Sequence, residues 1–326
     1  MQATRREPNH FIGASVLTVL AAIVAAGVLA LLMGVGAKPA EAASSGDKGK
    51  IAFASDRAGN MDIWVMNADG TNLVQLATNS DREVFPAWSP DGQKIAFVRG
   101  ERGPSQEIWL MNDDGTGQKQ LTFNGEQDIM PAWSPNGSNI AFVRIDSSSN
   151  AEVYVMSAAG GEEQNLTNSP DTFDEKPTWS PNGKQIAFDS DRSGAFAVHT
   201  MRSNGKYLRQ LTDDSLSAFD PAWSPSGDKL AFSDNGCCGE SDLFVMKADG
   251  TGVTQLFKTP KKNETHATWS PDGKRIAFER FKVTGNEKSF VPNSGEIYVI
   301  GEHGEGLTNL TNEPGSDDQL PDWSPK

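Results

Sequence analysis

The stretch Pro86–Phe97, PAWSPDGQKIAF, decides the fold, because it returns along the chain with few changes. Its tryptophan belongs to a Trp-Ser-Pro triplet that occurs six times, at intervals of 45, 46, 44, 46 and 54 residues: Trp88, Trp133, Trp179, Trp223, Trp269 and Trp323. A period of about 40–45 residues is typical of stacked supersecondary units that cannot bury their apolar faces alone. The sequence therefore predicts a repeat architecture.

Each repeat carries the signals of four short strands. In the first complete one, the turn Pro90–Gly92 joins two short apolar runs, which is typical of a β-hairpin. A third run such as Glu107–Met111, EIWLM, precedes an Asp-Gly turn and a fourth run that ends in Gln-Leu or Asn-Leu. No part of the repeats shows a helical period. Four antiparallel strands in about 45 residues are typical of one β-propeller blade.

The first and last repeats predict how the ring closes. Six Trp-Ser-Pro segments and six Ile-Ala-Phe or Leu-Ala-Phe segments are present. However, no Trp-Ser-Pro segment precedes Ile51–Phe53, and no Ile-Ala-Phe or Leu-Ala-Phe segment follows Trp323–Pro325. Pairing the last segment with the first restores a complete hairpin and removes two unpaired sheet edges. We therefore predict an all-β, six-bladed β-propeller over residues 44–326, closed by its C-terminal strand.

The repeat PAWSPDGxxIAF…DIYVMxxDG…QLT resembles the WD40-like repeats of the TolB propeller family, and the resemblance extends from Ile51 to Pro325. It implies an envelope protein whose propeller binds a partner, which in the family is a peptidoglycan-associated lipoprotein. Only a leader and a few linker residues precede Ile51, so the α/β domain that precedes the family's propeller is not expected. We expect a TolB-like propeller rather than TolB itself.

Residues 1–43 are expected to be a signal peptide or an N-terminal membrane anchor, with its linker. Phe11–Val35 is almost wholly apolar, follows Arg5 and Arg6, and at about 25 residues is long enough to span a bilayer. Ala40–Ala42, Ala-Glu-Ala, resembles a signal-peptidase site, so cleavage and retention both stay open. Either outcome predicts an extracytoplasmic propeller, periplasmic, secreted or anchored, because the arginines stay inside.

The formal net charge of −14 disfavours nucleic acid and anionic surfaces as partners. We expect contact with a membrane only through the N-terminal segment, a monomeric propeller, and an envelope protein or peptide, cationic in character, as the partner. The two cysteines, Cys237 and Cys238, are adjacent. Outside the cytoplasm they are candidates for a vicinal disulfide, with free thiols or intermolecular bridges as alternatives.

Candidate binding residues gather on the face that carries the loops into each Trp strand. Three positions before the proline of that strand, or before its equivalent, five of six repeats have an acid: Glu83, Asp128, Asp174, Glu264 and Asp318. One interpretation is structural, since a carboxylate at a strand entry accepts backbone N–H groups. The other is a ring around the channel mouth that binds a cation or a basic peptide, with His266 on the channel side as a further contact.

These acids suggest calcium as the cation they would hold, but six to eight oxygens must converge on that ion and no dense Asp-x-Asp-x-Asp loop is present. We therefore expect no dedicated metal site and no other cofactor. Between the second and third strands of the last full repeat, an insertion at 281–295 enlarges the same face. Variable loops on a rigid scaffold are where binding usually resides.

The functional prediction is an exported, non-enzymatic binding module that recognises a protein or peptide on this loop-rich acidic face. No Gly-x-Ser-x-Gly elbow, Cys/His metal cluster or phosphate loop occurs in the sequence, so no catalytic residue is assigned. The alternative is an extracytoplasmic hydrolase, lyase or lactonase with carboxylates and His266 as its site in the channel. The fold alone does not choose between the two.

Overall fold

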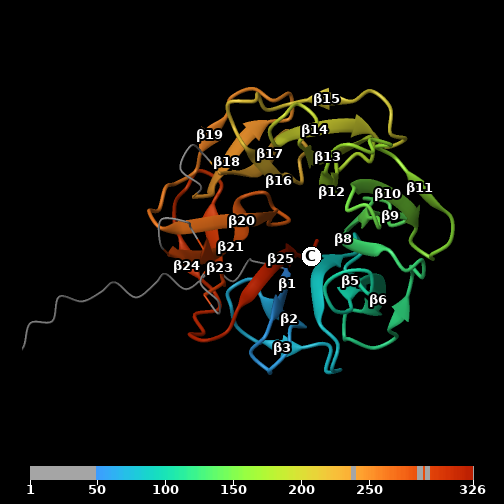
Figure 1. Ribbon diagram of the computed structural model, residues 1–326. Coiled ribbons are helices and arrows are strands. Elements are labelled where there is room, and N and C mark those ends of the chain that lie inside the picture. The colour runs from blue at the N-terminus through green and yellow to red at the C-terminus, as the bar shows by residue number, and fades with distance from the viewer. Residues whose placement is uncertain (1–48, 236–239, 285–288, 291–293, 326) are drawn as a thin grey trace, which may run out of the picture. The chain divides into compact units, whose positions relative to one another are not determined.

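The computed structural model describes residues 49–235, 240–284, 289–290 and 294–325 (Figure 1). The leader, the Cys237–Cys238 pair and residues 285–288 and 291–293 of the 281–295 insertion lie outside the described residues. Within the described residues, strands β1 to β25 form the regular secondary structure, and no helix occurs that is long and apolar enough to cross a membrane.

Six antiparallel sheets surround a central channel, which confirms the predicted six-bladed propeller (Figure 1). We name the sheets blades A to F in the order in which they follow one another around the ring. The innermost strand of each blade carries the Trp-Ser-Pro triplet at its end and lines the channel. The outermost strand is only two or three residues long, which leaves little exposed sheet edge on the rim.

From the channel outward, the first three blades have the following strands. Blade A contains β25 (Asp318–Trp323), β1 (Lys50–Ser55), β2 (Asp62–Asn67) and β3 (Val74–Gln75). Blade B contains β4 (Glu83–Trp88), β5 (Lys94–Arg99), β6 (Glu107–Asn112) and β7 (Lys119–Gln120). Blade C contains β8 (Gln127–Trp133), β9 (Asn139–Ile145), β10 (Ala151–Ser157) and β11 (Glu163–Asn165).

The other three blades repeat the pattern. Blade D contains β12 (Asp174–Trp179), β13 (Gln185–Ser190), β14 (Ala197–Arg202) and β15 (Arg209–Gln210). Blade E contains β16 (Ala218–Trp223), β17 (Lys229–Asp234), β18 (Asp242–Lys247) and β19 (Thr254–Gln255). Blade F contains β20 (Lys262–Trp269), β21 (Arg275–Thr284), β23 (Glu296–Gly301) and β24 (Thr308–Asn309), and β22 (Ser289–Phe290) pairs with the extended end of β21.

The ring closes without a covalent link, as the sequence predicts. β25 pairs with β1, and the Lys50 N–H donates to Ser324 Oγ at 2.8 Å while the Ser324 N–H donates to the Lys50 carbonyl at 2.8 Å. Blade B makes the same two bonds inside a continuous hairpin, between Ser89 and Lys94, at 2.9 and 2.8 Å. The closure therefore reproduces the geometry of an intact blade.

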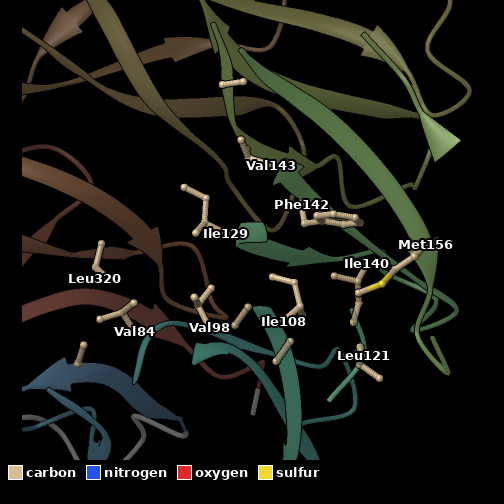
Figure 2. Close-up of a cluster of buried hydrophobic side chains, with 14 residues drawn as sticks. Val84, Val98, Ile108, Leu121, Ile129, Ile140, Phe142, Val143, Met156 and Leu320 are labelled. Atoms are coloured by element: carbon tan, nitrogen blue, oxygen red, sulfur yellow. The ribbon is translucent and has the colours of Figure 1, made fainter. Parts of the chain in front are cut away.

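The hydrophobic core lies between neighbouring blades rather than within any one of them. Ile63 and Val65 of blade A pack with Trp88 and Phe97 of blade B. Figure 2 shows the cluster that joins blades B and C, which also receives Leu320 from the closing strand. Because each blade is only one sheet thick, it can bury its apolar faces only against its neighbours.

A second contact between blades explains the Asp-Gly turns. Gly115 has a φ of 83°, and a Cβ added there would lie 2.2 Å from the carbonyl oxygen of Leu76 in blade A. Gly160 occupies the same place in blade C with a φ of 84°, but its Cβ would lie 3.5 Å from the Leu121 oxygen. The first glycine thus satisfies a backbone requirement and a steric one, and the second only the backbone requirement.

We expect Gly115→Ala to lower the free energy of unfolding by about 2 kcal/mol or more, and Gly160→Ala by about 1 kcal/mol. Both alanines would adopt a left-handed conformation, but only Ala at position 115 would also push two blades apart. Urea unfolding of the two variants beside the parent protein measures the difference. Equal losses would contradict the role assigned to the Leu76 contact.

Candidate functional site

A β-bulge in each innermost strand turns one side chain into the channel. The register with the neighbouring strand shifts between Val84 and Ala87 in blade B, and the other five blades show the same shift. The bulge residue has a φ between 51° and 57°, a costly conformation outside glycine. We call these six residues the channel ring: Leu320, Phe85, Met130, Lys176, Asp220 and His266.

The channel ring has two chemically different halves. Its members line a cavity of about 440 Å³ inside the propeller. Three neighbouring blades, A, B and C, contribute the apolar arc, which is Leu320, Phe85 and Met130. The other three blades, D, E and F, contribute the polar arc, which is Lys176, Asp220 and His266.

The same division continues one layer behind the ring. The residue after the buried phenylalanine of each second strand is apolar in blades A, B and C and polar in blades D, E and F: Ala54, Val98, Val143, Asp189, Ser233 and Glu279. All six are buried. An apolar and a polar wall therefore face each other across the channel, and each wall is two residues deep.

Carboxylates of blades D, E and F hold three residues of the channel ring in place by accepting backbone hydrogen bonds across blade boundaries. Asp189 accepts the N–H of Asp220 at 3.0 Å, Asp220 accepts that of His266 at 3.2 Å, and Glu279 accepts that of Leu320 at 3.2 Å. Each bond joins a carboxylate of one blade to the bulge of the next. The ring geometry is thus fixed before any ligand arrives.

The side chains of the polar arc also form a charge network. Lys176 Nζ lies 3.4 Å from Asp220 Oδ1, and His266 Nε2 lies 3.6 Å from Asp220 Oδ2. His266 Nδ1 lies 3.0 Å from Glu279 Oε2. Lys176 Nζ also lies 4.9 Å from the centre of the Phe85 ring, so it reaches the apolar arc.

Burial affects the carboxyl groups of this network unequally. Burial, followed by the charges of Asp220 and Glu175, raises the pKa of Asp189 well above its usual value. Burial also raises the pKa of Glu175. In Asp220 burial acts in the same direction, but the charges of His266 and Lys176 outweigh it and lower the pKa. One ionised carboxylate therefore stands beside two carboxyl groups that resist ionisation.

The five acids predicted from the sequence lie elsewhere. The side chains of Glu83, Asp128, Asp174, Glu264 and Asp318 are fully buried, and each lies against an arginine of its own blade, 2.6 to 3.0 Å away: Arg99, Arg144, Arg192, Arg280 and Arg57. They do not form an exposed ring at the channel mouth. The structural interpretation of these acids fits this arrangement, although their partners are arginines rather than backbone N–H groups.

A pattern in the sequence indicates these pairs. In blades B, C and F the arginine lies within the second strand, two residues after its buried phenylalanine, whereas in blades A and D it lies four residues after that phenylalanine and two residues beyond the strand. Blade E has Ala218 instead of the acid, opposite Asp234, and its second strand ends without an arginine. Acid and arginine are therefore present together or absent together, which is typical of a buried ion pair.

His266 lies in the channel ring, on the side where the sequence analysis placed it, and its role in binding stays a prediction. Sequence reasoning missed Lys176 and Asp220, which complete the polar arc. Over the described residues, no group of three or more His, Cys, Asp or Glu side chains is arranged to hold a metal ion.

Comparison with known proteins places this geometry in a family. Residues 26–215, more than half of the chain, match the model of the TolB beta propeller domain. A Tol-Pal system protein TolB from Albidiferax ferrireducens is 36% identical over 61 residues, which are 18% of this chain and 14% of that protein. A protein TolB homolog from Chlorobaculum tepidum is 41% identical over 49 residues, 15% of this chain and 11% of that protein. The matches thus span about an eighth of these relatives' length.

Solved structures share the fold over a larger part of the chain. TolB from Acinetobacter baumannii superposes with a TM-score of 0.71 at 23% identity, over 86% of this chain and 67% of that one. A putative TolB from Agrobacterium tumefaciens superposes with a TM-score of 0.66 at 14% identity, over 86% of this chain and 100% of that one. An oligogalacturonate lyase from Vibrio parahaemolyticus superposes with a TM-score of 0.55 at 13% identity, over 80% of this chain and 73% of that one. With its family model matched and its six blades closed, the chain belongs to the TolB β-propeller family.

Proposed function

We propose that this protein is an exported, non-enzymatic binding module of the cell envelope. The apolar leader and the family both support a location outside the cytoplasm, because curated relatives carry the name Tol-Pal system protein. We further propose that it recognises a protein or peptide where the channel opens on the loop-rich face. The matches to these relatives are short, so the partner is argued here from the surface of this chain.

The observation that supports this site best is the divided channel ring. Six side chains are held in strained bulges around a cavity of about 440 Å³, with an apolar wall facing a charged one. A protein does not hold six non-glycine residues at positive φ unless the surrounding structure imposes it, and such strain gathers at functional sites. A pre-formed cavity with apolar walls and a few fixed polar groups is typical of ligand sites.

The cavity runs from the channel ring towards the Trp-Ser-Pro ends of the innermost strands, so the ring forms its end nearer the loop-rich face, and the loops of that face offer further contacts. Phe123, in the loop before β8, is 73% exposed, and Phe173, in the loop before β12, is 44% exposed. Exposed carboxylates occupy the same set of loops, which supports a cationic partner: Asp81, Asp171, Asp213, Asp214 and Glu313. Exposed aromatic residues beside polar groups are typical of protein interfaces.

Binding is favoured over the alternative of a hydrolase, lyase or lactonase. Both ring nitrogens of His266 face carboxylates, Nε2 towards Asp220 and Nδ1 towards Glu279. These contacts orient the imidazole but direct neither nitrogen at a substrate, as a general base requires. The similarity to a lyase is a similarity of fold alone.

Photo-crosslinking tests the proposal. A photoreactive phenylalanine analogue replaces Phe85 in the ring, Phe123 on the loop-rich face, or Tyr207 on the opposite face, which is 69% exposed. We expect the variants at 85 and 123, incubated with envelope extract, to yield one shared protein adduct that the variant at 207 does not form. All three changes replace one aromatic residue by another, so they are matched. An adduct from position 207 alone, or none from three folded variants, would contradict the proposal.

A further inference from the structure

The polar half of the channel carries more acid than base. Four carboxyl groups lie at or directly behind the polar arc, on Glu175, Asp189, Asp220 and Glu279. Lys176 is the fixed cation that faces them, and His266 adds a charge only when protonated. Burial raises the pKa of Glu175 and Asp189, and another positive charge beside them would favour their ionised forms, so the network can accept a further cation.

A buried hydroxyl at the same site points in the same direction. Ser233 occupies in blade E the position that Asp189 and Glu279 occupy in blades D and F. Its side chain is fully buried, and its Oγ has no hydrogen-bond partner among the described residues. A buried polar atom left unpaired is costly, so the layer directly behind the polar arc keeps an unused hydrogen-bonding group.

Lys176 shows inside the protein how a cation fits between the two walls. Its ammonium lies between the Asp220 carboxylate at 3.4 Å and the face of Phe85 at 4.9 Å. An ammonium in this place gains an ion pair on one side and a cation–π contact on the other. A ligand with the same group would compete with Lys176 for both contacts.

We propose that the channel ring binds an organic cation, a primary ammonium or a guanidinium carried beside an apolar group. The charged end contacts Asp220 in the ring, in front of Glu279 and Ser233 in the buried layer behind it, and the apolar part packs on Leu320, Phe85 and Met130. The cation comes from a lysine, arginine or amino terminus of a peptide, or from a small soluble amine. The inference rests on the proposed function only for the peptide source.

A metal ion fits this site less well than an organic cation. Lys176 lies inside the network and would repel a divalent ion about twice as strongly as a monovalent organic cation. The oxygen atoms are also already oriented by backbone N–H donors. A compact ion would also leave the apolar arc without a contact. An N–H donor group on an apolar stem uses both arcs, since it brings hydrogen bonds to the acids and apolar surface to the opposite wall.

Isothermal titration calorimetry of the protein with pairs of cationic and neutral probes tests the inference. Benzylamine is compared with its neutral analogue benzyl alcohol, and acetyl-Leu-Lys-Leu-amide with the peptide in which norleucine replaces lysine. We expect each cationic probe that binds to do so at least about tenfold more tightly than its neutral partner, which corresponds to about 1.4 kcal/mol. Binding of the peptide alone assigns the cation to a polypeptide, and binding of benzylamine alone assigns it to a small amine.

Two neighbouring substitutions should change the affinity in opposite directions. Asp220→Asn removes the main counter-charge, so we expect about tenfold weaker binding of the cationic probe. Lys176→Met removes the internal competitor and keeps an apolar stem, so we expect about tenfold tighter binding. Asp249→Asn, on an exposed turn of the opposite face, is the matched control and should change nothing. Thermal unfolding of each variant verifies that it is folded.

Equal binding of charged and neutral probes, or shifts of the same sign in the two variants, would overturn the inference. If Asp220→Asn fails to fold, the Lys176→Met variant tests the inference alone. Its affinity for the cationic probe should rise, because the substitution removes the half-buried ammonium that competes with the probe. A cation that binds while no crosslink to an envelope protein forms rejects the proposed partner and keeps the site. A crosslink to an envelope protein, without any preference for the cationic probes, keeps the proposed partner and rejects the cation site.

Discussion

Removing residues 318–326 is expected to abolish the folded state of this protein rather than to weaken it. The deletion removes β25 and leaves both β1 and the flanking blades without their partner strand. It also removes buried Trp323 and Leu320, and it exposes Ile51 and Ala52, which are fully buried in the closed ring. An open ring loses two interfaces between blades at once, which exceeds what a marginally stable domain can tolerate.

A circular permutant separates the loss of closure from the loss of sequence. In this variant residues 313–325 precede Lys50, joined through Asp-Gly-Gln as at positions 91–93, and the chain ends at residue 312. We expect the deletion to lose the near-UV circular dichroism of its tryptophans and its cooperative urea transition, and the permutant to keep both. A deletion variant that unfolds cooperatively at the parent's urea midpoint would contradict the role of closure.

The second large effect concerns the buried ion pairs, which differ between blades. Glu83→Gln in blade B is expected to lower the free energy of unfolding by about 3 kcal/mol. Glu83 Oε1 accepts from Arg99 Nε at 2.9 Å and from Arg99 Nη2 at 2.6 Å, so the substitution leaves a buried guanidinium without its counter-charge. The same change at Glu264 in blade F should cost nothing or stabilise the protein at neutral pH.

The reason for this difference is the state of Glu264. Burial raises its pKa to about 8, even though the charge of Arg280 acts in the opposite direction. Arg280 Nε lies 3.0 Å from Glu264 Oε1, yet neither atom has a well-aligned hydrogen bond among the described residues. A carboxyl group with this pKa is mostly protonated at pH 7, so glutamine replaces a group that is already neutral.

The pH dependence has a definite sign. The folded state holds the Glu264 proton more tightly than the unfolded chain, where the pKa is near 4.5. The parent protein therefore loses stability relative to Glu264→Gln as the pH rises from about 4.5 to about 8. Urea unfolding of parent and variant at several values in this window measures the trend. A constant difference across the window would show that Glu264 is ionised throughout.

The fold could be predicted from the sequence because every repeat carries the same pattern of strands and turns. The same turn, apolar runs and Trp-Ser-Pro triplet occur in each blade, so an ambiguous strand in one repeat is resolved by the others. The phase difference between Ile51–Phe53 and Trp323–Pro325 even predicted closure, which β25 and β1 confirm. Local pattern and global architecture agree here, as they do in most foldable sequences.

The candidate site could not be predicted in the same way, because a bulge decides it. Simple alternation places Glu83 and Phe85 on the same side of the strand, yet the structure buries Glu83 inside the blade and turns Phe85 into the channel. A register shift leaves no clear mark in one repeat. The signal lay in comparing the repeats three positions before each Trp-Ser-Pro triplet, where apolar residues occur in blades A to C and charged or titratable ones in blades D to F.

The closing hydrogen bond joins residues 274 positions apart in the sequence, between Lys50 and Ser324. Contacts of such long range form slowly, because the whole intervening chain must be brought together first. During synthesis β1 emerges early but waits for its inner neighbour until almost everything else has been made. We expect the nascent polypeptide to remain incompletely assembled over that interval. In the export proposed above, this delay would suit threading through a secretion pore, with final assembly on the far side of the membrane.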